Sequence, residues 1–247
     1  MARTREPDSS LARRVLPPPL YRAATHVFAQ DITGCMLVGG TALAGYYAGH
    51  RRSDDLDLFV LDDDAHRATV LAVSSLRRLG CRIGEILSSA QYFKASCNLE
   101  RHDFTVDVVL DPTVHALGSP LLAKDGVQVA SLEILLSQKA ATLVSRCSEK
   151  DLYDLRWLFQ QDPGLDLGDL LALGARIDGG LTAEGALISL AGTEPRLAAC
   201  GFSLSQADRE VLDEVKALKR SLEKGLEQIA RGQPAPAIGK LVRTLKK

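Results

Sequence analysis

The fold is decided by the stretch Gly39-Gly40-Thr41-Ala42-Leu43, which is followed by Asp55-Leu56-Asp57-Leu58-Phe59. The apolar run at residues 35–38 predicts a short buried strand that leads into the glycines, and residues 41–49 favour a helix. A second apolar strand, expected over residues 55–61, carries both aspartates. Because side chains two apart on a strand point to the same face, the two carboxylates are expected to converge.

Two features of this motif are typical of enzymes that act on phosphate groups. Two converging carboxylates suit a hard divalent cation such as Mg²⁺. A glycine-rich turn at the start of a helix presents main-chain N–H groups to an anion, most often phosphate. Together they predict an enzyme that handles a nucleoside triphosphate with a metal. The competing interpretation of the two aspartates is a solvated acidic turn, which is how we interpret Asp62-Asp63-Asp64.

Composition describes an ordinary globular protein with enough chain for one large or two modest domains. Hydrophobic residues make up 46% and charged residues 25%, and the net charge is −1. No overall basic field therefore argues for nucleic acid, although both ends are locally basic. From Arg231 onward the chain has five basic residues and no acidic one.

The five cysteines are far apart and form no CxxC pair, which favours small buried residues of a reducing compartment over a zinc or disulfide framework. The sequence contains neither an apolar run of 18 residues nor a signal peptide. We therefore expect a cytoplasmic protein with no membrane partner.

Three segments are expected along the chain. Residues 1–19 are interpreted as a flexible basic arm, residues 20–130 as an α/β domain and residues 131–247 as a helical domain that completes the active-site cleft. Further strands are predicted at 81–87, 91–97 and 104–110, with a turn at 98–102 that indicates an antiparallel hairpin. Helices are predicted at 20–30, 65–79, 131–146, 149–160, 166–176, 182–190 and 205–231.

Asp107 is a candidate third carboxylate. It is a lone acid inside the run Phe104-Thr105-Val106-Asp107-Val108-Val109-Leu110, where burial is costly without a metal or partner. The other interpretation is that alternation turns it to solvent. Arg51 brings positive charge to the same region, where it contacts phosphate or pairs with an aspartate.

The motif from Gly39 to Phe59 resembles the first motif of the AbiEii-type nucleotidyltransferases, within the polymerase-β-like superfamily. The resemblance continues in Ser131-Leu132-Glu133, Lys139-Ala140-Ala141, Arg146 and Lys150-Asp151-Leu152-Tyr153-Asp154-Leu155. These blocks are similar to the family's lysine helix and to its helix with the basic-Asp-x-x-Asp-Leu pattern. About residues 35–160 are covered.

This resemblance implies an α/β fold with a mixed, largely antiparallel sheet and flanking helices, followed by a helical region. It also implies transfer of NMP from an NTP with Mg²⁺ or Mn²⁺, often by the toxin of a toxin–antitoxin pair. On the resemblance, Asp55 and Asp57 would be metal ligands, to which the candidate Asp107 adds a third. Lys139 would contact the triphosphate, and Asp151 or Asp154 would complete the acidic cluster or activate the acceptor hydroxyl. The expected nucleotide-binding residues are Gly39, Gly40, Thr41, Arg51, Ser53, Lys139 and Arg146.

The residues of the second block leave alternatives open. Lys139 lies on a mostly apolar helix, so it either snorkels or points into a polar cleft. Lys150-Asp151 and Asp154-Arg156 are also compatible with surface ion pairs. We expect the acceptor to be an RNA or tRNA 3′ end, with a cognate antitoxin as a further partner. Two alternatives are transfer to a small molecule of the aminoglycoside type and a domain of the same fold that only binds a partner and does not catalyse.

Overall fold

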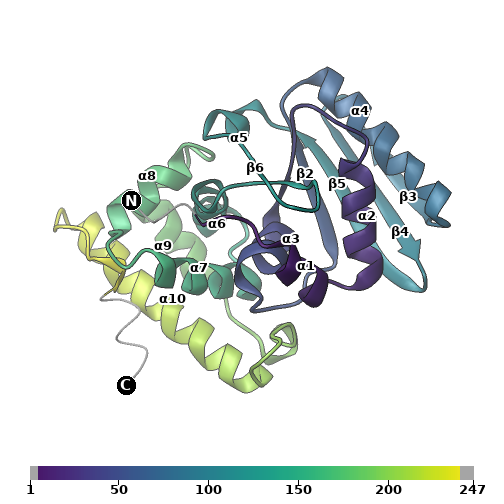
Figure 1. Ribbon diagram of the computed structural model, residues 1–247. Helices are drawn as coiled ribbons and strands as arrows, with labels where there is room; N and C mark the ends of the chain where they lie inside the picture. The colour runs from purple at the N-terminus through teal and green to yellow at the C-terminus, as the bar shows by residue number, and fades with distance from the viewer. Residues whose placement is uncertain (1–4, 240–247) are drawn as a thin grey trace. The chain divides into compact units, whose positions relative to one another are not determined.

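The computed structural model in Figure 1 describes residues 5–239. It divides into two compact units, one that ends at Ser131 and one that begins at Leu132. The first contains all the strands of the described chain, whereas the second is built from helices. Each unit has its own buried core and is described by itself.

Seven strands of the described chain form one sheet in the order β3-β4-β5-β2-β1-β7-β6. The pairs β2/β5 and β1/β7 are parallel, and the other neighbours are antiparallel. The expected mixed, largely antiparallel sheet is therefore confirmed. The strands are β1 (Cys35–Val38), β2 (Asp55–Val60), β3 (Arg82–Ser88), β4 (Tyr92–Leu99), β5 (His102–Leu110), β6 (Leu121–Leu122) and β7 (Gln128–Val129).

Two helices, α2 (Pro18–Phe28) and α4 (Asp63–Ser74), pack along one side of the sheet (Figure 1). Alternation along the strands explains which side chains they cover. Leu56 and Leu58 of β2 are fully buried, while the residues between them are partly exposed. The same pattern on β5 places Thr105 and Asp107 on the partly exposed face. Short helical segments η2 (Ser75–Leu79) and α5 (Pro112–Ala116) follow α4 and β5.

The prediction of a flexible arm over residues 1–19 is wrong for most of that stretch. Helix α1 (Ser9–Val15) begins where the side chain of Asp8 accepts hydrogen bonds from the main-chain N–H groups of Ser10 and Leu11. Ala12 and Leu16 are buried, so the apolar side of this short helix packs on the α/β unit. Residues 1–4 lie outside the described residues, as do residues 240–247, which include four of the five basic residues counted from Arg231 onward.

The helix after the glycines begins two residues earlier than expected. Helix α3 (Gly39–Leu43) starts with both glycines and continues as a π-helical segment, η1 (Ala44–Ala48). Tyr46 and Tyr47 are fully buried, and the Tyr47 hydroxyl donates a 2.9 Å hydrogen bond to the main-chain oxygen of Ala130. This contact fixes the motif helix next to the end of β7.

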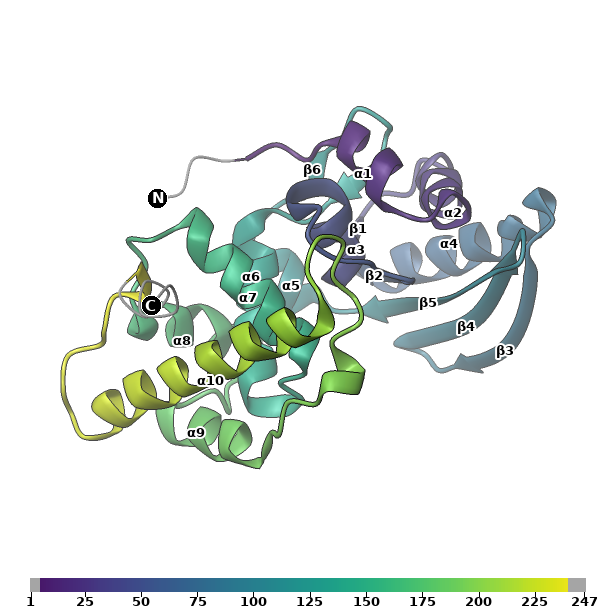
Figure 2. The same ribbon diagram turned by 90° about the horizontal axis from the view of Figure 1, so that it is seen from below.

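The second unit is helical, as expected. Figure 2 shows α10 running beside α7 and α9, with which it packs. The helix predicted at 205–231 is present as α10, and its apolar stripe is buried at Val211, Val215, Leu218, Leu222 and Leu226, with Ile229 partly buried. Within residues 5–239, none of the helices has the length and apolar character needed to traverse a bilayer. The helices are α6 (Leu132–Ser145), α7 (Glu149–Gln161), α8 (Leu167–Ala175), α9 (Ala183–Gly192), η3 (Leu197–Ala199) and α10 (Asp208–Ala230).

Candidate active site

Strands β2 and β5 bring the three predicted carboxylates to one face of the sheet. Their parallel register makes Asp57 and Asp107 Cα partners and places Asp55 opposite Thr105. Asp55 and Asp57 are two residues apart on β2, so all three side chains share the face that α2 and α4 leave uncovered. The convergence expected from the sequence is thus present in the backbone.

Neighbouring side chains hold two of these carboxylates. The Thr105 hydroxyl donates a 2.7 Å hydrogen bond to Oδ1 of Asp55. Lys94 Nζ lies 3.3 Å from Oδ1 and 3.1 Å from Oδ2 of Asp107, and the Tyr92 hydroxyl also donates to Oδ1. The hydrogen bond to Asp107 raises the pKa of Lys94 against the opposing effect of burial, so the ammonium stays charged.

The donor set fits a hard divalent cation in its chemistry. It consists of carboxylate oxygens from adjacent strands, which are the ligands that Mg²⁺ prefers. However, across residues 5–239 no group of three or more His, Cys, Asp or Glu side chains lies in a geometry that could hold a metal ion. The Asp107 carboxylate accepts hydrogen bonds from Lys94 and Tyr92. The three-aspartate metal set therefore stays a prediction.

Gly39 is required where the chain passes Asp57. Its φ of +67° lies in the left-handed region, which side chains other than glycine rarely adopt. In addition, a Cβ atom at this position would overlap the Asp57 carboxylate and lie 2.9 Å from its Cγ. A residue without a side chain is thus needed at Gly39 for the Asp57 carboxylate to fit.

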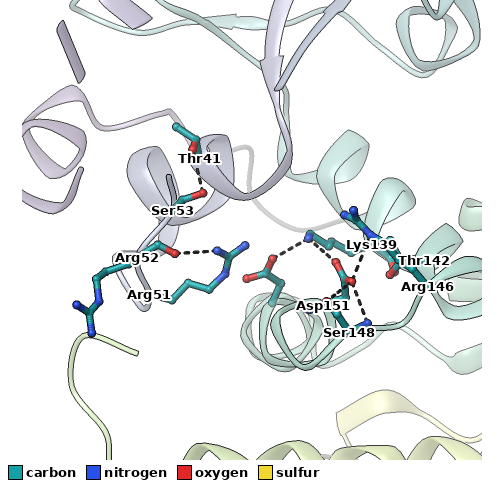
Figure 3. A network of polar contacts seen from close by, with 10 residues as sticks. Thr41, Arg51, Arg52, Ser53, Lys139, Thr142, Arg146, Ser148 and Asp151 are labelled. Carbon is teal, nitrogen blue, oxygen red and sulfur yellow. Dashed lines mark hydrogen bonds and ion pairs between the residues drawn. The ribbon is translucent and has the colours of Figure 1, made fainter. Parts of the chain in front are cut away.

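Gly40 leaves space for Arg51 in a similar way, because a side chain at this position would clash with the guanidinium. A Cβ at Gly40 would lie 2.5 Å from Arg51 Nη2 and 3.0 Å from Ser53 Oγ. Arg51 is buried and its Nη1 donates a 2.9 Å hydrogen bond to the main-chain oxygen of Arg52 (Figure 3). The guanidinium therefore lies against the start of α3, where the sequence predicted a phosphate or aspartate contact.

Thr41 and Ser53 form a buried link under this turn. Thr41 Oγ1 lies 2.9 Å from Ser53 Oγ and donates to the main-chain oxygen of Asp55. Figure 3 shows the Thr41 and Ser53 side chains directed at each other. Both side chains are buried. They connect α3 to the loop before β2, and their predicted nucleotide contact stays a prediction.

In the helical unit, Lys139 of α6 pairs with two aspartates of α7. Its Nζ lies 2.8 Å from Asp151 Oδ1 and 2.8 Å from Asp154 Oδ2 (Figure 3 labels the first of these partners). All three side chains are buried. Both aspartates are thus buried against Lys139, unlike the surface ion pairs considered from the sequence, and Arg156 pairs with Glu214 at 2.7 Å.

Asp151 also caps the start of helix α7. Its Oδ2 accepts hydrogen bonds from the hydroxyl and the main-chain N–H of Ser148, at 2.6 and 3.1 Å, in a capping box. Arg146 Nε lies 3.6 Å from the same oxygen. Burial by itself would raise the pKa of Asp151, but Lys139, Ser148 and Arg146 together outweigh it and lower that pKa.

Two residues of the face, Tyr92 and Thr105, were not among the sequence candidates. Alternation contains the signal that would have found them. Thr105 is two residues before Asp107 on β5, and Tyr92 is two residues before Lys94 on β4, which pairs with β5. Neither is charged, so the pattern alone did not separate them from ordinary strand residues.

The mixed sheet, the glycine turn and the row of carboxylates define a nucleotidyltransferase fold. The sequence from residue 20 to 242 matches the family described as nucleotidyl transferase AbiEii toxin, of type IV toxin–antitoxin systems. The chain belongs to this family, which confirms the resemblance found in its motifs. It is accordingly a nucleotidyltransferase of a toxin family.

MenT4 shows the same fold as this chain at low sequence identity. MenT4, a nucleotidyltransferase toxin of Mycobacterium tuberculosis, is 18% identical, with a TM-score of 0.52 over 96% of this chain and 98% of that one. JHP933 of Helicobacter pylori is 16% identical, with a TM-score of 0.49 over 96% and 98% of the two chains. A search of curated proteins finds no match.

Proposed function

We propose that this enzyme transfers a nucleoside monophosphate from an NTP to a hydroxyl at an RNA 3′ end, with tRNA as the expected acceptor, and uses a divalent cation. The observation that carries the proposal is the row formed by Asp55, Asp57 and Asp107 beside the Gly39-Gly40 turn. The carboxylates suit a metal, and the turn suits the triphosphate. The family adds a toxin role, for which we propose a cognate antitoxin as partner.

In the proposed reaction, the acceptor oxygen forms a bond to the α-phosphorus and the bond to the β-phosphate bridging oxygen breaks. Pyrophosphate leaves, and the hydroxyl proton passes to a carboxylate of this face. A bound divalent cation would supply charge neutralisation and a lowered pKa of the attacking hydroxyl. Asp55 and Asp57 would hold it, while Lys94 and Tyr92 orient Asp107.

The test is a transfer assay with each of the four α-labelled NTPs, Mg²⁺ and total tRNA. The Asp55→Ala/Asp57→Ala double variant is the control. Label in RNA with the wild type alone would support the proposal and identify the nucleotide. Mg²⁺-dependent NTP binding without label in RNA would contradict the RNA acceptor and direct attention to a small molecule or a protein.

A further inference from the structure

A second feature of the carboxylate face is a depression of about 450 Å³ beside Asp55. It lies over β5, β4 and β3, on the opposite side of Asp55 from the glycine turn, because the strand order is β3-β4-β5-β2-β1. Small residues form its middle. Ser96 of β4 is the Cα partner of Thr105, which is in turn the partner of Asp55. Gly84 of β3 lies beside Ser96, because a Cβ there would be 2.9 Å from Ser96 Oγ. The sheet therefore offers a hollow directly next to a candidate catalytic carboxylate.

The geometry of in-line transfer indicates which reactant this depression would bind. The attacking and leaving oxygens lie on opposite sides of the phosphorus in such a reaction. If the triphosphate lies at the Gly39-Gly40 turn beyond β2, the attacking hydroxyl approaches from the β5 side. The depression occupies that side, so it suits the acceptor and not the leaving pyrophosphate.

Charge around the depression limits the chemistry of its occupant. Asp54, Asp55 and Asp103 border it, with Arg82 as the one cationic side chain among its lining residues. Arg82 Nη2 donates to Asn98 Oδ1 at 3.0 Å, and Asn98 Nδ2 donates to Asp103 Oδ1 at 2.6 Å. Carboxylates accept hydrogen bonds from hydroxyl and amino groups and repel phosphate.

We propose that this depression binds the phosphate-free, hydroxyl-bearing ring unit that ends the acceptor, such as one terminal nucleoside. This inference rests on the proposed function and adds the acceptor subsite to it. Both the 3′ end of an RNA and a free polyol or amino sugar carry such hydroxyl groups, so the experiment distinguishes between these two kinds of acceptor.

Filling the depression tests the assignment. Ser96→Leu places a larger apolar side chain in the middle of the hollow, on an exposed strand position that tolerates it. Ser88→Leu makes the same change on β3 outside the depression and is the matched control. We expect Ser96→Leu to raise the acceptor KM at least about tenfold, with unchanged KM for NTP, and Ser88→Leu to change neither.

The acceptors in the assay are tRNA with a free 3′ hydroxyl, single nucleosides and an aminoglycoside, and the acceptor labelled by the wild type identifies the source. Binding by NMR provides a readout without turnover: adenosine and cytidine should bind the wild type more tightly than their 3′-monophosphates, and Asp103→Asn should reduce that preference. Transfer by the wild type that Ser96→Leu leaves unaltered, or a raised KM for NTP, overturns the subsite alone. No transfer to any acceptor overturns the proposed function and the subsite with it.

Discussion

The Asp57 carboxylate occupies the space in which Gly39 would carry a side chain. This relationship connects the two halves of the motif, because Gly39 directly follows Val38, the last residue of β1 and the Cα partner of Asp57 on β2. A residue required for backbone conformation and a residue proposed for catalysis thus depend on each other.

Gly39→Ala is therefore expected to damage activity more than stability. An alanine in the left-handed region costs about 1–2 kcal/mol of unfolding free energy. Its methyl group would also displace the Asp57 carboxylate, and displacement of about 1 Å at a reacting centre lowers the rate about 100-fold. Urea unfolding and NMP transfer measure the two effects.

Gly80→Ala is the matched control for Gly39→Ala. Gly80 has a similar φ of +83°, and a Cβ there would have nothing within 4 Å. This variant should lose the same unfolding free energy and keep full activity. Equal activity losses in both variants would show that strain, and not the contact with Asp57, is what matters.

Lys94→Met is expected to tighten the binding of Mn²⁺. The substitution removes the Lys94 ammonium, which lies 3.1 Å from the Asp107 carboxylate. Mn²⁺ then no longer competes with this ammonium for the carboxylate. The dissociation constant should fall about fivefold or more, as measured by calorimetry without NTP. Lys124→Met, in the turn between β6 and β7, is the control. Weaker Mn²⁺ binding by Lys94→Met would contradict this role.

Lys139→Met should unfold far more easily than the wild type. It would leave Asp151 and Asp154 buried without their shared cation, and breaking a buried ion pair from one side costs about 3–5 kcal/mol. Lys150→Met, on the exposed side of α7, should change the unfolding free energy by less than about 0.5 kcal/mol. A Lys139→Met protein as stable as the wild type would show that the triad is dispensable for folding.

The lowered pKa of Asp151 makes the helical unit sensitive to acid. Its ionised form is favoured in the folded state, so this contribution to stability is complete above the unfolded pKa of about 3.9. It decreases as the pH falls from there through the lower folded pKa. Thermal unfolding between pH 6 and pH 3 should show the decrease, and Asp151→Asn should have a shallower dependence on pH in this window. Parallel curves for both proteins would disprove the assignment.

Patterns within single segments predicted most of the elements. Strands β1, β2, β4 and β5 alternate or are continuously apolar, and α10 repeats its apolar residues every three or four positions, so their faces followed from spacing. Helix α1 was missed because its apolar face covers little more than Ala12 and Leu16 in an otherwise polar stretch. Its cap at Asp8 was the available signal.

The partners of the site residues could not be predicted in the same way. Lys139 and Asp154 form an ion pair between two helices. Sequence spacing within one helix does not predict which of several acidic side chains a lysine will pair with. The buried link between Thr41 and the Asp55 main chain also arises from the packing of distant segments. Local spacing indicates which residues share a face, whereas their contacts depend on tertiary packing.

The central claim is that the β2 and β5 carboxylates perform nucleotidyl transfer. Asp57→Ala tests it most directly, with Asp63→Ala, an exposed acid at the start of α4, as the matched control. Because removal of one carboxylate relieves repulsion among its neighbours, Asp57→Ala should fold like the wild type. Transfer of α-labelled nucleotide should be abolished in Asp57→Ala and retained in Asp63→Ala. Transfer by Asp57→Ala at the wild-type rate would contradict the account.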